Sequence, residues 1–143
     1  MGDENSRIET LDKQLAALLR KATDEQRRAA ALAICSLAAH RTKLDDSRVD
    51  VAREALAGGT VGDCPEREAV VKLAIEWDEQ AWAVQETDTA EYQRAFAKAR
   101  AAAGFESAFD PDSYVAAGEA AYEASYAIGD AETVRVAVAK ILS

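Results

Sequence analysis

The sequence predicts an all-α fold: a compact single domain of six to seven helices packed around one buried central helix. The chain has 143 residues, which is the size of one domain. Alanine, the strongest helix former, accounts for 33 of them. Apolar residues recur at helical spacing, and no segment shows the alternation of a strand. These observations together favour closely packed helices.

The segment Ala29–Ala39 is the predicted central helix. Its eleven residues carry no charge and a single hydroxyl group, on Ser36. The segment is too short to span a bilayer, which needs about 20 apolar residues, and it has no polar side to turn toward water. A helix that is apolar on all sides belongs in the interior, so we expect the other helices to cover it.

Capping patterns divide the first half of the chain into three helices. Each pattern has a Ser or Thr whose side chain can accept a hydrogen bond from the first turn of the helix. The helices are expected to begin after Ser6, Thr23 and near Ser47, and to end near residues 22, 41 and 57. Gly58 and Gly59 end the third helix. The segment 58–62, GGTVG, is the candidate hinge within the single domain 1–143.

The second half is expected to form four helices, over 65–86, 89–103, 111–128 and 131–142. Pro65 suits the first position of a helix because that position needs no amide hydrogen. Gly104 and Gly129 each follow an apolar run, so both are interpreted as helix ends. The segment 105–110 is therefore expected to be a loop, and Asp110 is expected to cap the helix that follows.

The net charge of −9 lies entirely in the second part of the chain. Residues 1–58 carry ten basic and ten acidic side chains, whereas residues 59–143 carry seven basic and sixteen acidic ones. A nucleic-acid-binding protein would need a basic stripe, and the sequence has none. The charge distribution instead favours a partner protein with a basic surface, or solubility alone.

The start of the chain indicates neither secretion nor a membrane anchor. MGDENSRIE has no apolar stretch of the kind found in a signal peptide. Gly2 and Ser6 match the formal N-myristoylation pattern, but Asp3 and Glu4 stand where basic residues would hold an acyl chain on an anionic membrane. We therefore expect a cytoplasmic protein that does not bind membranes.

No residue pattern predicts a catalytic site, a metal site or a cofactor. The single histidine, His40, has no second ligand at a metal-binding spacing. The glycine-rich segment 58–62 is not followed by the Lys and Ser or Thr of a phosphate-binding loop. Cys64 precedes a predicted helix N-terminus, a position that favours a thiolate, so it is the one residue to test for reactivity.

Acidic residues without nearby basic ones indicate a binding surface. Residues 76–91 contain six acidic side chains and no basic one, and residues 101–134 contain seven more. Helix capping explains some of these, but not all. Trp82 is expected to face outward, because Trp77 occupies the apolar side of the same helix. The predicted partner-binding residues are Glu76, Asp78, Glu79, Trp82, Glu86, Glu119 and Glu123.

A row of tyrosines offers a second interpretation. Tyr114, Tyr122 and Tyr126 recur at multiples of four residues, as side chains on one side of a helix do. They are expected either to pack in the core or, together with Glu119, to line a pocket between helices. In the second case the protein would bind a small molecule or act as an enzyme.

The segment Arg27–Gly59 resembles parts of small alanine- and arginine-rich proteins encoded in actinobacterial genomes. This resemblance implies an all-helical, cytoplasmic bacterial protein, and it implies no activity and no catalytic residue. The leading hypothesis from the residues is a non-catalytic, acidic binding protein of the immunity or antitoxin type, which masks a basic surface of its partner. The alternatives are the tyrosine-lined pocket and a self-associating helical scaffold, so a homo-oligomer is left open.

Overall fold

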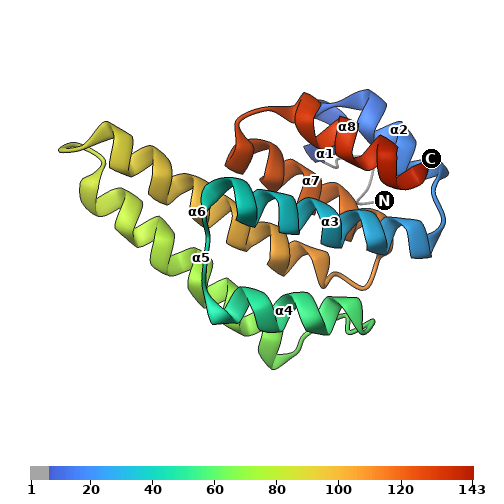
Figure 1. Cartoon of the computed structure of the whole chain (residues 1–143), viewed down its shortest axis with the longest axis horizontal. Coiled ribbons are helices and arrows are strands. Elements are labelled where there is room, and N and C mark those ends of the chain that lie inside the picture. Colours follow the sequence, from blue (N-terminus) through green and yellow to red (C-terminus); the bar gives the residue numbers. More distant parts are fainter. Residues whose placement is uncertain (1–6) are drawn as a thin grey trace.

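The all-α prediction is confirmed by the computed structural model, which describes residues 7–143 (Figure 1). Gly2 and Ser6, with the myristoylation and capping patterns that include them, lie outside this range. The described residues form eight helices and no strand. The helices are α1 (Arg7–Leu11), α2 (Lys13–Lys21), α3 (Asp24–Thr42), α4 (Ser47–Ala57), α5 (Pro65–Val84), α6 (Thr89–Ala108), α7 (Ser113–Ile128) and α8 (Ala131–Leu142).

The predicted first helix is divided into α1 and α2 at Asp12. The Asp12 carboxylate accepts a hydrogen bond from the Leu15 amide at 3.0 Å, so it caps the start of α2. Arg135 of α8 donates to the other oxygen of this carboxylate at 2.8 Å. A side chain that bonds to the local backbone competes with a continuous helix. This break raises the number of helices from the predicted six or seven to eight.

The most enclosed of the described helices is α7, and not α3. Eleven of the sixteen residues of α7 are buried, and it packs against α1, α2, α3, α6 and α8. In α3, by contrast, Leu32 and Leu37 are only half-buried and Ala29 is exposed. Six of the eleven residues 29–39 are buried, so the segment is an inner helix as predicted, but one side of it is only partly covered. Six of the eleven buried residues of α7 are alanine and one is glycine, and such small side chains let helices approach from several directions.

Helix α6 continues through Gly104, where the sequence predicted its end, and reaches Ala108. A Cβ atom at residue 104 would lie 3.7 Å from the Cys35 sulfur and from the Ala120 carbonyl oxygen, so the neighbouring helices pass close to this glycine. Their packing outweighs the low helix propensity of glycine, about 1 kcal/mol. The loop prediction for 105–110 is wrong for residues 105–108, which continue α6, and holds for Phe109 and Asp110, which follow it. Phe105 is fully buried.

The other predicted helix ends are close to those observed. Thr23 and Gln26 form the predicted capping box, and Pro65 begins α5. Two caps differ by one or two residues from the prediction, since Asp46 caps α4 and Asp112 caps α7. The candidate hinge 58–62 is attached to the end of α6, because the Gly62 amide donates to the Phe109 carbonyl at 2.6 Å.

Gly129 ends α7 as predicted, in the left-handed conformation at φ 86°. Gly129→Ala is expected to lower the free energy of unfolding by about 1 kcal/mol, because a Cβ atom disfavours this backbone conformation. Nothing lies within 4 Å of the new Cβ position, so the loss would report backbone strain alone. Urea denaturation measures it. Gly58→Ala is the control, and it should not cause this loss because Gly58 has φ −83°.

Helices α5 and α6 form a long antiparallel hairpin. Figure 1 shows that its turn, between Val84 and Thr89, extends beyond the other helices, at the extremity of the molecule. The opposite half of the hairpin packs against α3, α4 and α7. The bundle therefore holds one half of the hairpin in place, and the free half presents the end of α5 to solvent.

Candidate functional site

Glu119 and Glu123 belong to a partly exposed ion-pair network that joins α1, α6 and α7. Arg7 of α1 contacts both carboxylates, and Arg100 of α6 donates to Glu123 at 3.0 Å. Glu123 is only 5 % exposed. The carboxylates of both residues are therefore already paired with arginines of the chain, so we do not include them in the candidate binding surface. No basic residue stands near them in the sequence, but α1 and α6 bring arginines to them from more than twenty positions away.

The same network reaches α5 through Arg100. Its second terminal nitrogen donates to Asp78 at 3.0 Å, and its guanidinium carbon lies 5.5 Å from the centre of the Phe96 ring. Glu76 is paired separately, with Arg48 of α4 at 2.9 Å. Asp78 and Glu76 thus already have cationic partners within the chain. They contribute little negative charge to an interface.

Arg48 joins α4 to α5 through two carboxylates, and its hydrogen bonds hold the pKa of both Asp46 and Glu76 below their usual values. The resulting stabilisation is fully present at a pH above the pKa values that these two carboxyl groups have in the unfolded chain. It is lost as the pH falls below about 4 and the carboxylates become protonated. Arg48→Ala is therefore expected to flatten the decline in stability between about pH 5 and pH 3. Urea denaturation across this range checks the slope. Arg94→Ala, which removes an exposed pair within one helix, should leave the slope unchanged.

The side of α5 that faces away from the bundle combines apolar and acidic residues. We define the outer face of α5 as Val71, Ile75, Glu79 and Trp82, with Glu86 in the turn that follows. Steps of four, four, three and four residues keep these side chains on one side of a helix. They lie opposite the buried residues of α5, which are Val70, Leu73, Ala74 and Ala81.

Trp82 and Ile75 are the most exposed large apolar side chains of the outer face, at 71 % and 51 %. Neither Glu79 nor Glu86 takes part in an ion pair within residues 7–143. The predicted exposure of Trp82 is confirmed. The sequence reasoning missed Ile75 and Val71, although both stand off the apolar side of the helix, and that spacing could have revealed them.

A hollow of about 560 Å³ adjoins the start of the outer face. It is lined by Asp63, Cys64, Arg67, Glu68, Val71 and Glu106. Arg67 donates to Glu106 at 2.9 Å and to Asp63 at 3.5 Å, so it neutralises part of the acidic lining. Cys64 is half-buried, and its side chain makes no capping hydrogen bond. The lining contains no histidine that could act as a base toward the thiol.

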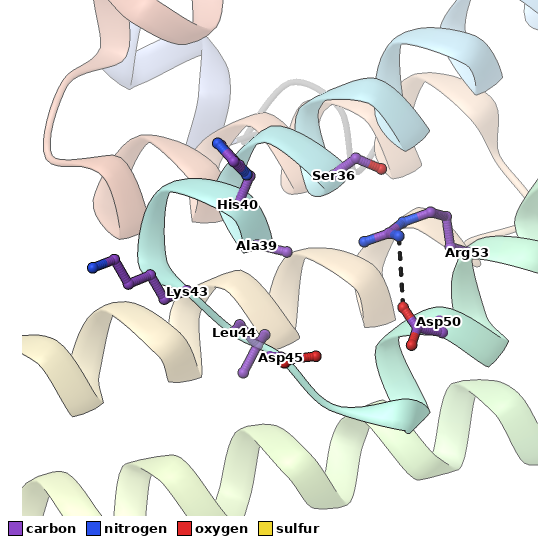
Figure 2. A pocket seen from close by; sticks show the side chains of 8 residues that line it. All are labelled: Ser36, Ala39, His40, Lys43, Leu44, Asp45, Asp50 and Arg53. Atoms are coloured by element: carbon purple, nitrogen blue, oxygen red, sulfur yellow. Dashed lines mark ion pairs between the residues drawn. The ribbon is translucent and has the colours of Figure 1, made fainter.

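A second hollow, of about 440 Å³, lies between the end of α3 and helix α4 (Figure 2). His40 lines this hollow, away from Cys64. Asp50 and Arg53 form an ion pair across 3.6 Å, and Figure 2 shows Arg53 reaching from α4 toward α3 while Lys43 points away from the pair. The lining mixes acidic and basic side chains, so it does not favour a ligand of either charge.

Tyr114 is occupied by contacts within the protein. Its hydroxyl donates to Glu9 of α1 at 3.0 Å, and it accepts from Arg20 of α2 at 3.5 Å. Burial raises the pKa of Tyr114, and the hydrogen bond to Glu9 adds to this effect. Tyr114 therefore fixes the N-terminal helices against α7.

Tyr122 and Tyr126 form a separate pair, with ring centres 5.0 Å apart. The Arg7 guanidinium lies 4.1 Å from the centre of the Tyr122 ring, and the neighbouring Tyr126 hydroxyl raises the pKa of Tyr122. Tyr126 is exposed and lines a hollow of about 210 Å³ with residues of α1 and α8. Glu119 and Tyr122 meet at Arg7, whereas Tyr114 is held separately by Glu9 and Arg20. Of the four predicted pocket residues Tyr114, Tyr122, Tyr126 and Glu119, the hollow at α1 and α8 is lined by Tyr126 alone.

Comparison with known proteins gives no further assignment: no family model, no curated protein and no solved structure matches this chain. In residues 7–143, no three His, Cys, Asp or Glu side chains are grouped so that they could hold a metal ion. None of the helices in this range has the length and apolar character needed to cross a membrane. The outer face of α5 is therefore the candidate site, on the strength of its own geometry.

Proposed function

We propose that this protein is a non-catalytic binding module that masks a basic surface of a partner protein with the outer face of α5, in the manner of an immunity protein or antitoxin. The observation that carries the proposal is the 71 % exposed indole of Trp82 at the projecting half of the α5–α6 hairpin. A large apolar side chain so exposed gains nothing from the folding of this chain, and exposed aromatic residues are typical anchors of protein interfaces.

Electrostatics supports a basic partner. Glu79 and Glu86 flank Trp82 and have no cationic partner among the described residues, while the whole chain has a net charge of −9. Negative charge around an apolar anchor accelerates the encounter with a positive surface and disfavours an acidic one. The same charge opposes self-association through this face, because a second copy would bring like charges together. We place the complex in the cytoplasm.

The test is retention of cell proteins on the immobilised chain at about 50 mM and about 500 mM salt, since high salt screens exposed charges. We expect the wild-type chain to retain a basic protein at low salt and to release it at high salt. Trp82→Ala should weaken this binding about 30-fold, which corresponds to about 2 kcal/mol for a central aromatic anchor. Val136→Ala, at a 48 % exposed position of α8, is the matched control and should bind normally.

Two controls make the result decisive. Glu79→Gln and Glu86→Gln together should reduce the salt dependence, because they remove the unpaired charges and keep similar shapes. The free energy of unfolding of the Trp82→Ala variant should lie within about 0.5 kcal/mol of the wild-type value, as is usual for a substitution at an exposed position. Retention of partners that depends neither on salt nor on Trp82 would refute the proposal.

A further inference from the structure

We propose that the partner supplies a single amphipathic α-helix, with Lys or Arg on both sides of an apolar stripe, that lies lengthwise along the outer face of α5. This inference rests on the proposed function and adds the structural class of the element that binds. Its occupant is a segment of another protein, and not a second copy of this chain.

The dimensions of the outer face fit a helix. Val71 and Trp82 are eleven residues apart on a continuous helix, which corresponds to about 16 Å at 1.5 Å per residue. Ile75 lies between them on the same side. The apolar positions thus form a straight line with helical spacing, and a second helix presents its own apolar residues along such a line. A partner helix of about three turns would cover all three side chains.

The charges around this line define the chemistry of the partner. Glu79 stands between Ile75 and Trp82, and Glu86 follows Trp82 in the turn. At the other end, Glu68 is exposed and lines the hollow of about 560 Å³. Lys72 is the one basic residue on this side of α5. Acidic side chains therefore accompany the apolar stripe along its whole length, which is the complement of a basic amphipathic helix.

The hollow provides a place for one end of the partner. Val71 and Glu68 belong both to its lining and to the exposed side of α5, so the hollow continues the line of the outer face. Arg67 is already paired with Glu106, whereas no ion pair in the described residues includes Glu68. A Lys or Arg of the partner helix would enter here and pair with Glu68.

The absence of strands in residues 7–143 argues for a helix over an extended peptide. An extended segment usually gains affinity by adding to the open edge of a sheet, where its backbone groups find partners. The side of a helix has no free backbone groups to offer. A helix satisfies its own amides and carbonyls, and it can therefore bury its apolar side against α5 without leaving backbone groups unpaired.

The test compares two synthetic peptides of about 18 residues with the same Leu and Lys content. In one peptide leucine recurs with the period of a helix, and in the other it alternates with lysine as in a strand. Binding to the full chain is followed by fluorescence anisotropy of labelled peptide, with circular dichroism to monitor its helix content. We expect the helix-patterned peptide to bind about tenfold or more tightly than the strand-patterned one.

The variants assign this binding to the outer face of α5. Ile75→Ala and Trp82→Ala should each weaken binding of the helix-patterned peptide about tenfold, and Glu68→Gln with Glu79→Gln should reduce its salt dependence. Val136→Ala should have no effect. Each variant is first checked for an unchanged melting temperature, because all of these side chains are exposed.

The outcomes separate this inference from the proposed function. Equal or tighter binding of the strand-patterned peptide would refute the inference that the partner segment is a helix. The proposal of a basic partner would still stand. If Trp82→Ala and Ile75→Ala leave the affinity for the helix-patterned peptide unchanged, the inference is refuted, even if the chain still retains a basic protein in a salt-dependent way. A dimer in solution that dissociates on Trp82→Ala would place a second copy on this face and would overturn both.

Discussion

Phe105→Ala is expected to lower the free energy of unfolding by about 3–5 kcal/mol, the largest effect of any single substitution discussed for this chain. Phe105 is fully buried in the main core, one residue after Gly104, where α6 passes close to α3 and α7. Alanine is the commonest residue of this core, and its side chain is too short to fill the space that a lost ring would leave. The surrounding structure can therefore collapse only partly into the cavity.

Urea denaturation followed by circular dichroism measures this loss. Phe96→Ala is the matched control, because Phe96 belongs to the same helix but is only half-buried, and its loss should be clearly smaller. A domain is stable by only about 5–15 kcal/mol, so the Phe105 variant should unfold at a much lower urea concentration. Equal losses in the two variants would contradict the full burial of Phe105.

Glu123→Ala should have the second largest effect, a loss of about 2–3 kcal/mol. The substitution removes the carboxylate that pairs with both Arg7 and Arg100, and it leaves each arginine with one counter-charge, Glu119 for Arg7 and Asp78 for Arg100. Breaking a buried ion pair from one side is costly because the remaining charge stays desolvated. The partial exposure of both arginine side chains, 48 % and 23 %, places the expected loss below that of a fully buried pair.

The double variant Glu123→Ala with Arg100→Ala tests the network directly. Because the Glu123–Arg100 contact can be lost only once, the double variant should be more stable than the sum of the two single losses predicts, although Asp78 also loses its partner Arg100. Thermal melts of the four proteins give the interaction energy. If Glu123 instead acted as a surface contact for a partner, Glu123→Ala would weaken binding and leave the melting temperature nearly unchanged.

The local predictions succeeded where a few neighbouring residues determine the backbone. The capping box of Thr23 and Gln26, Pro65 at the start of α5 and Gly129 at the end of α7 all act within one helical turn. The exposure of Trp82 was also predictable, because Trp77 fixes which side of α5 faces inward. In each case the decisive interaction joins residues that are close in sequence.

The failures share the opposite property. Arg7 meets Glu119 across 112 sequence positions, and Arg48 meets Glu76 across 28. A count of charges along the sequence therefore finds uncompensated acids where the folded chain has ion pairs. Gly104 has the residue type of a helix end, but the close approach of α3 and α7 keeps it helical. Contacts of this kind leave no mark in a short window of sequence.

The sequence by itself determined that the chain is helical, where most of its helices begin and end, and which side of α5 carries Trp82. Only the tertiary structure decided that α7 is the enclosed helix, that four of the predicted binding acids are neutralised by arginines, and that Ile75 joins Trp82 on an open surface. The physical reason is the separation along the sequence over which each interaction acts. Helix propensity and capping act over a few residues, whereas burial and ion pairing depend on which helices the folded chain brings together.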